Sequence, residues 1–189
     1  MTSDFEIILE VLAGNQNAYA KLVRQYEGKV RGYCAAMLSD STQAEDAAQE
    51  VFIKVFYALD KFRGNSSFST WLYRITVNHC HDTLRKIIRR KAESWEALLE
   101  KEGDKIEKMF SAPAAGVTNL EQQELLHKIL SQLPEKSREI IILREKEGLS
   151  YQEMADTLEC TVDAVKARLK RARQELEVKV RHLLATKGV

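Results

Sequence analysis

Residues 149–173 read LSYQEMADTLECTVDAVKARLKRAR, and this stretch predicts two helices separated by a short break. Ser150 and Glu153 have the spacing of a capping box, in which two side chains satisfy free backbone amides at the start of a helix. After the break, Thr161 is suited to cap the second helix. Two helices joined in this way predict a helix-turn-helix, the motif that places its second helix in the major groove of DNA.

The second helix is expected to bury one face and to expose positive charge on the others. Apolar residues recurring three or four positions apart predict the inward face, namely Val165, Leu169, Ala172 and Leu176. Cations cover the remaining directions, namely Lys166, Arg168, Lys170, Arg171 and Arg173. A helix in the major groove has phosphates on both sides, which favours DNA binding over an ordinary solvated helix, where Glu and Lys would be mixed. Asp163 either complements the helix dipole or accepts a hydrogen bond from a base.

The composition predicts an all-α protein. Of the 189 residues, 44% are hydrophobic and 30% are charged, which is typical of a folded protein and argues against disorder. Only 2 prolines and 8 glycines interrupt the chain, and no stretch alternates apolar and polar residues for the length of a strand. The net charge of +1 does not exclude a nucleic-acid binder, because only the face near the phosphates has to be basic.

Two small helical domains joined by a flexible linker are expected. In the first half, apolar residues follow helical periodicity in three stretches, 19–37, 41–56 and 68–90, with a polar loop at 61–67. Residues 92–118 lack a sustained apolar face, apart from one helical turn expected near Trp95, and the helical pattern resumes at Leu125. The expected boundaries are therefore 1–91, 92–118 for the linker, and 119–189. Ser41 or Thr42 is expected to cap the second helix, and Ser137 to cap a helix that ends at Gly148.

The cysteines and the chain ends indicate a cytoplasmic protein without a cofactor. Cys34, Cys80 and Cys160 are odd in number and far apart, which favours reduced thiols over a disulfide framework. The first residues do not form a signal peptide, and no segment approaches the ~20 apolar residues of a membrane span. His79, Cys80 and His81 do not predict a metal site, since consecutive helical residues point about 100° apart; a core cysteine between exposed histidines is expected. No set of catalytic residues is present, so an enzyme is not expected.

Two motifs in the first half identify the family that the chain resembles. Residues 46–50 read DAAQE, which is similar to the D-x-x-Q-E motif of sigma region 2.2. Residues 68–75 read FSTWLYRI and are followed by Val77 and Asn78, which resembles regions 2.3 and 2.4 of extracytoplasmic-function sigma factors. The helix-turn-helix resembles region 4.2. These motifs lie in the family's order, and the set is more specific than any one of them.

The resemblance implies that the chain binds RNA polymerase core through the helix that carries DAAQE. Asp46, Gln49 and Glu50 lie at i, i+3 and i+4, so they share the exposed side of a helix whose other side is apolar. On pattern alone, an ordinary solvated face is the favoured explanation of such a patch. The family implies instead that this patch docks on the clamp helices of the largest subunit, with a further contact to the polymerase flap. The implied core-binding residues are Asp46, Gln49, Glu50 and Ile53.

The resemblance also implies which residues contact promoter DNA. At the −10 element, bases flipped from the duplex enter pockets lined by amides, hydroxyls and aromatic rings, while cations contact phosphates. The implied −10 residues are Arg63, Asn65, Ser66, Ser67, Phe68, Trp71, Arg74, Asn78, Arg85 and Lys86. Phe68 and Trp71 are alternatively core residues, as large aromatic side chains usually are. The implied −35 residues are Arg144, Thr161, Val162, Lys166, Arg168, Lys170, Arg171 and Arg173.

The function implied is that of an alternative sigma factor for a stress-response regulon, held inactive by an anti-sigma factor. A free-standing helix-turn-helix regulator with a helical sensing domain is the second hypothesis. Such a regulator has no use for the DAAQE patch followed by FSTW in the first half. An anti-sigma or adaptor protein, the third hypothesis, does not account for the basic second helix.

Overall fold

The computed structural model of the chain describes residues 3–38, 40–99 and 128–186. Every regular element in these ranges is helical, which confirms the predicted all-α class. The first half contains α1 (Asp4–Leu12), α2 (Tyr19–Met37), α3 (Ser41–Ala58) and α4 (Phe68–Leu99), with short 3₁₀ turns at Gln16–Ala18 and Leu59–Lys61. In these ranges, no helix is long and apolar enough to cross a membrane.

The helices of the first half pack through the faces that their periodicity predicts. α3 buries Ala47, Ala48, Val51 and Val55 against α2 and α4, and small residues in this set allow the helices to approach closely. At the centre, the thiols of Cys34 on α2 and Cys80 on α4 are buried, with their sulfur atoms 3.7 Å apart. Both thiols are free, and the contact with Cys34 together with burial raises the pKa of Cys80.

The start of α3 differs from the prediction. Its N-cap is Asp40, whose carboxylate accepts a hydrogen bond from the Gln43 amide at 2.8 Å, whereas Ser41 is already helical. Asp and Ser are nearly equal as N-caps, so the preceding residue was as good a candidate. Ser3 caps α1 through a capping box with Glu6.

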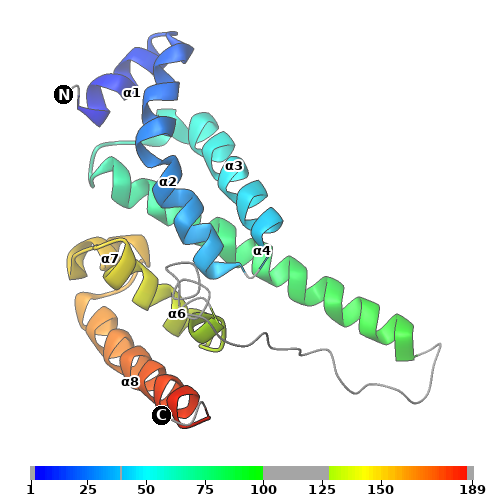
Figure 1. Cartoon of the computed structure of the whole chain (residues 1–189). Helices are drawn as coiled ribbons and strands as arrows, with labels where there is room; N and C mark the ends of the chain where they lie inside the picture. The colour runs from blue at the N-terminus through cyan, green and yellow to red at the C-terminus, as the bar shows by residue number, and fades with distance from the viewer. Residues whose placement is uncertain (1–2, 39, 100–127, 187–189) are drawn as a thin grey trace.

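α4 is longer than its apolar periodicity indicates. The helix continues to Leu99, so 92–99, which were assigned to the linker, are helical; the rest of the proposed linker lies outside the described residues. Figure 1 shows the second part of α4 projecting beyond the bundle formed by α1, α2 and α3. The helix therefore presents a long cationic edge at Arg85, Lys86, Arg89 and Arg90 away from the core.

The second half forms the predicted helix-turn-helix. It comprises a helical turn at 128–131, α6 (Glu135–Ile141), a π-helical turn (Ile142–Lys146), α7 (Tyr151–Thr157) and α8 (Val162–Thr186). The capping box of Ser150 with Glu153 is present, and Thr161 accepts from the Ala164 amide at 3.2 Å, as predicted. Ser137 does not cap a helix: α6 begins after Pro134, and Ser137 is buried inside it. Pro134 already fixes the backbone φ angle at the start of α6. Gly148 ends the segment with φ +72°.

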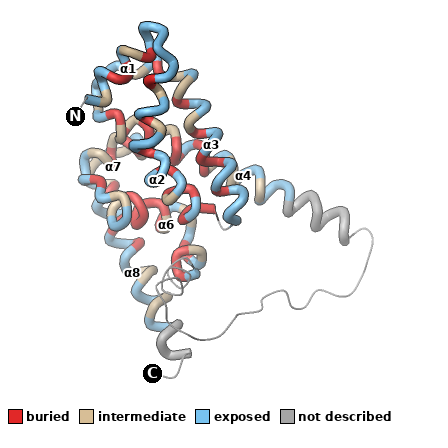
Figure 2. The backbone as a smooth tube through the Cα atoms, turned by 45° about the horizontal axis from the view of Figure 1, so that its top comes forward, coloured by how far each residue is buried: buried red, intermediate tan, exposed pale blue. Residues whose placement is uncertain are grey.

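The two halves pack against each other. α6 and α7 lie against α2 and α4, and Figure 2 shows buried positions where these helices meet. Arg138 of α6 donates to the Met37 carbonyl at the end of α2 (2.8 Å), and desolvation lowers the pKa of its guanidinium. Lys146 donates to the Gly32 carbonyl at 2.7 Å. The apolar core is continuous from α1 to α8.

Candidate partner-binding and nucleic-acid interfaces

The residues predicted to bind polymerase core lie together on the outer side of α3. Asp46, Gln49, Glu50 and Ile53 are all exposed, and Ile53 retains 56% of its accessible surface although it is aliphatic. The opposite side of the helix is buried, so the backbone of α3 is held rigidly behind these four side chains. The face combines two carboxylates, an amide and an exposed apolar side chain, which suits a basic or amide-bearing helix of a partner.

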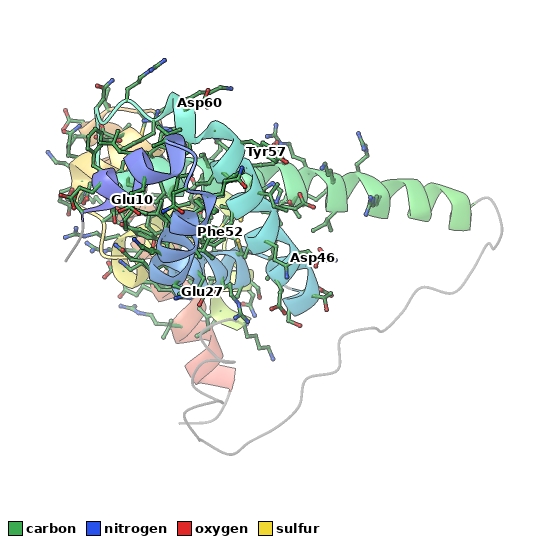
Figure 3. All side chains as sticks on the ribbon, turned by 90° about the horizontal axis from the view of Figure 1, so that it is seen from above. Glu10, Glu27, Asp46, Phe52, Tyr57 and Asp60 are labelled. Atoms are coloured by element: carbon green, nitrogen blue, oxygen red, sulfur yellow. The ribbon has the colours of Figure 1, made fainter. Side chains whose placement is uncertain are left out.

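A groove and an exposed tyrosine extend this face. The groove lies between α2 and α3, has a volume of about 320 Å³, and is lined by Val23, Glu27, Arg31, Glu45, Ala48, Gln49, Phe52 and Ile53. Figure 3 shows Asp46, Phe52 and Tyr57 following one another along α3. Tyr57 is 77% exposed and was missed by the sequence analysis, although its position four residues after Ile53 is a signal that was present.

Behind this face, a buried histidine contacts Glu50 and the neighbouring Lys54. His79 of α4 is only 3% exposed, with Nδ1 2.7 Å from Nζ of Lys54 and Nε2 3.5 Å from a carboxylate oxygen of Glu50. Burial, followed by the charge of Lys54, lowers the pKa of His79 and favours the neutral imidazole. The prediction that both histidines flanking Cys80 are exposed was wrong, because α3 covers His79 and α6 approaches His81.

The loop that precedes α4 presents several predicted −10 residues. Arg63 and Asn65 are exposed, and Ser66 is partly exposed. Gly64 adopts φ +72°, a conformation that L side chains rarely adopt, so the tight loop depends on glycine there. The Ser67 hydroxyl accepts from the Thr70 amide at 3.1 Å and thereby caps α4, which ties this hydroxyl to the helix start.

Two of the predicted −10 aromatic residues belong to a ring cluster. Phe68 is 3% exposed and packs edge-on against Tyr26 and Phe62, so it is a core residue that supports the loop from behind. Trp71 is half-buried, with its ring centroid 5.4 Å from that of Phe62. The alternative that these rings are core residues therefore describes Phe68, whereas Trp71 is only partly buried.

The remaining −10 candidates follow α4. Asn78, Arg85 and Lys86 are exposed, and Arg85 pairs with Asp82 at 2.7 Å. Arg74 is half-buried because its guanidinium contacts the end of α7. Asn78 also faces the second half of the chain, because it lines a cavity at that junction, and Lys86 lines a groove beside Asp46 and Glu50 of α3. The fold therefore does not gather these candidates on one free surface.

The cations predicted on α8 are exposed on every side except the buried face of Val165, Leu169 and Ala172. Lys166 pairs with Asp163 at 3.3 Å, and Arg173 pairs with Glu145 at 2.7 Å, which raises the pKa of its guanidinium. Three exposed cations have no ion-pair partner among the described residues, namely Arg168, Lys170 and Arg171.

At the entrance to α8, Thr161 is exposed and Val162 is half-buried. Arg144 donates to the Leu149 carbonyl at 2.7 Å and lies 4.9 Å above the ring of Tyr151. Tyr151 is 36% exposed, and the charged guanidinium of Arg144 lies over its ring. The contacts of Arg144 hold the turn before α7, the first helix of the helix-turn-helix. Across the described ranges, no group of three or more His, Cys, Asp or Glu side chains is placed to hold a metal ion.

The two halves match two families. Residues 22–90 match the family described as Sigma-70 region 2, and residues 123–176 match Sigma-70, region 4. The first match contains α3, the loop and most of α4, and the second contains the helix-turn-helix.

Relatives match along almost the whole chain. The RNA polymerase sigma-H factor of Pseudomonas aeruginosa is 36% identical over 184 residues, covering 96% of this chain and 95% of that protein. The ECF RNA polymerase sigma-E factor of Escherichia coli (strain K12) is 37% identical over 186 residues, covering 96% of each chain.

Two solved structures have a similar fold. CnrH, solved in complex with the cytosolic domain of CnrY, matches with a TM-score of 0.71 at 24% identity, over 96% of this chain and 99% of that one. The sigma factor RpoE of Bartonella quintana, solved with the anti-sigma factor NepR, matches with a TM-score of 0.65 at 26% identity, over 86% of this chain and 96% of that one.

Proposed function

Because the chain belongs to the extracytoplasmic-function sigma factors, we propose that it binds RNA polymerase core and directs it to the promoters of a stress-response regulon. The observation that carries the proposal is the presence, in one chain, of an exposed docking face on α3 and a basic helix-turn-helix. A free-standing regulator accounts only for the second of these features. The chain supplies specificity and strand opening, while the polymerase supplies the chemistry, so we infer no enzymatic activity of its own.

The docking face consists of Asp46, Gln49, Glu50 and Ile53, and its partner is the clamp of the largest polymerase subunit. Exposed carboxylates attract a basic helix during encounter, and Ile53 provides apolar area that becomes buried in the complex. The groove beside Phe52 accepts a side chain of the partner. The second half contacts the polymerase flap.

The −10 element is read by the loop at 62–67 and by the adjacent side of α4. Asn65 and Ser66 offer an amide and a hydroxyl to a flipped base, and the partly buried Trp71 offers a stacking surface. Arg63, Arg74, Arg85 and Lys86 contact phosphates, with Asn78 beside them. Ser67 and Phe68 support the loop, Ser67 by capping α4 and Phe68 by packing below it.

The −35 element is read as duplex DNA by α8. Its N-terminal residues, Thr161 and Val162, face base edges, while the cations along the helix contact both phosphate backbones. These cations are Lys166, Arg168, Lys170, Arg171 and Arg173, with Arg144 at the turn. The complex forms in the cytoplasm, where an anti-sigma factor holds the chain inactive. The structure of the sigma factor RpoE with the anti-sigma factor NepR supports this regulation.

Reconstitution with purified bacterial core polymerase tests the proposal. We expect the chain to co-elute with core and to support run-off transcription from genomic fragments of its host, and both activities to be lost in Asp46→Ala/Glu50→Ala. Glu177→Ala on α8 is a matched control, because its side chain and that of Glu50 are each 59% exposed. DNA binding without any association with core would support the free-standing regulator instead.

A further inference from the structure

Arg74, a proposed −10 residue, is occupied by the second half of the chain. Its Nε and Nη2 atoms donate to the backbone carbonyl of Asp156, at 3.1 and 2.6 Å, and Nη1 lies 3.6 Å from a carboxylate oxygen of Glu159. The carbonyls at the end of α7 carry the negative end of the helix dipole, so they suit a cation. A phosphate cannot bind this guanidinium fork while α7 holds it.

Proposed −10 and −35 residues also meet at one small cavity. Asn78 of α4 and Arg168 of α8 both line a hollow of about 170 Å³ between the two halves. In a promoter the two elements are separated by roughly 85 Å of duplex, at about 3.4 Å per base pair for some 25 base pairs. Residues that share one cavity cannot contact both elements. The arrangement in this structure is therefore closed with respect to promoter DNA.

A buried ion pair joins the two halves beside this cavity. Nε2 of His81 on α4 lies 2.7 Å from Oε1 of Glu139 on α6, and 3.4 Å from Oε1 of Glu135. The Glu139 side chain is only 4% exposed. A carboxylate that has lost its water needs a nearby cation, and removal of one partner of such a pair leaves a costly unpaired charge. A positive charge at His81 thus favours closure of the two halves, in addition to the apolar core and the hydrogen bonds of Arg138 and Lys146.

The groups that face His81 decide the direction in which its pKa shifts. Contact with the Glu139 carboxylate, aided by Glu135, raises the pKa of His81, against the lowering effects of burial and of Arg85. The cavity at this junction brings charges of both signs from three segments, namely Lys136 of α6, Glu159 after α7 and Arg168 of α8. In the open state His81 loses Glu139, so its pKa returns toward the ordinary value. The closed state consequently holds the proton more tightly.

We propose that, in the free chain, the second half closes over the promoter-facing side of α4, and that the ion pair of His81 with Glu139 makes this closure depend on protonation. The occupant of that side of α4 is the chain's own α6–α7 segment. The part of the inference that concerns promoter masking rests on the proposed function, whereas closure itself does not. The closed state is favoured at acidic pH. Opening releases one proton while the pH lies between the ordinary pKa of a histidine and the raised pKa of His81. Over that range the equilibrium constant for closure falls by about tenfold per pH unit as the pH rises.

Small-angle X-ray scattering of the purified full chain tests the closure. The radius of gyration is expected to increase between about pH 6 and pH 9, a range that brackets histidine titration. Glu139→Gln removes the buried charge, so this variant is expected to stay compact across the whole range. A wild-type radius that is constant with pH, or a Glu139→Gln variant that expands as the wild type does, would overturn the proposal.

A pair of variants separates the ion pair from simple packing. His81→Ala leaves the buried carboxylate unpaired and is expected to be expanded at every pH, with helical circular dichroism unchanged. His81→Ala/Glu139→Gln has lost even more of the contact, yet it is expected to be compact again because no buried charge remains. If the double variant is as expanded as His81→Ala, packing and not charge holds the halves together. Should His81→Ala not fold, the Glu139→Gln pH series still decides.

Transcription assays distinguish the failure of this inference from that of the proposed function. Expansion with rising pH without any core-dependent transcription would contradict the proposed function and leave the closure standing. Core-dependent transcription by a wild-type chain whose radius of gyration stays small at every pH would support the proposed function and contradict the pH-dependent closure. If both hold, His81→Ala is expected to bind promoter DNA more tightly than the wild type at pH 6, where the wild type is closed.

Discussion

The imidazole of His79 on α4 accepts a hydrogen bond from the ammonium group of Lys54 on α3, with 2.7 Å between Nδ1 and Nζ. The arrangement requires a neutral ring whose Nε2 carries the proton and faces Glu50. Lys54 and Glu50 are four residues apart on α3, so one buried ring contacts both of these charged residues beside the docking face. Protonation would place a second cation beside Lys54.

The free energy of unfolding is therefore expected to depend on the protonation of His79. Because the folded pKa is lowered, the unfolded chain binds the proton first as the pH falls. Stability is full above the ordinary pKa and decreases as the pH falls from that value through the lowered one. The slope does not exceed about 1.4 kcal/mol per pH unit, the limit for one proton. Urea titrations measure this pH dependence in the wild type and in His79→Asn. The asparagine keeps an acceptor near the position of Nδ1 but does not titrate. Parallel pH profiles for the two proteins would contradict it.

Ile53→Ala is expected to weaken core binding without changing the stability of the free chain. The side chain is 56% exposed, so its burial contributes little to folding, but burial against the polymerase clamp contributes about 1 kcal/mol, or roughly fivefold in affinity. Ile88→Ala is the matched control, since Ile88 is 62% exposed on α4. Fluorescence anisotropy with purified core measures both variants, and equal affinities would remove Ile53 from the interface.

Lys170→Ala and Arg171→Ala are expected to reduce the salt dependence of binding to −35 duplex DNA. Each phosphate contact that is lost lowers the slope of log K against log salt by about 0.9. Arg181→Ala, at the far end of the same helix, is the control and should leave the slope unchanged. A variant whose slope equals that of the wild type does not contact phosphate.

Ser150→Ala is expected to destabilise the helix-turn-helix by about 1 kcal/mol, because the Glu153 amide loses its partner. The backbone amide of Ser150 donates to the Glu153 carboxylate and lowers its pKa. The stabilisation from this hydrogen bond to the carboxylate is fully present above the ordinary pKa of a glutamate. It is lost as the pH falls through the lowered pKa of Glu153. Thermal unfolding at neutral and acidic pH should show a smaller decrease for Glu153→Gln than for the wild type. Gln152→Ala is the control, because Gln152 is exposed and directly precedes Glu153.

Local patterns in the sequence predicted most of the helices and their inward faces. Val51 and Val55 are buried as their spacing indicates, and the cap of Ser150 with Glu153 is formed by residues three apart. Two wrong predictions are local, namely the helix caps expected at Ser41 or Thr42 and at Ser137. Other features that were not predicted are contacts between distant segments. Arg74 meets Asp156, a separation of 82 residues, and His79 meets Lys54 from another helix, so no local pattern reports either contact. For Phe68 the sequence left a −10 contact and a core position open, and ring contacts with distant Tyr26 and nearby Phe62 bury its side chain.

α4 joins three surfaces within less than one helical turn. His79 points to α3, Cys80 to the thiol of Cys34, and His81 to Glu139, as expected for successive residues about 100° apart. A chimaera of two related proteins that is joined anywhere between Cys34 and Cys80, the loop at 62–67 included, takes the two thiols from different parents. A chimaera joined between His81 and Glu139 divides the third pair in the same way. Exchange of DNA-reading segments between relatives therefore has to carry both members of each pair together.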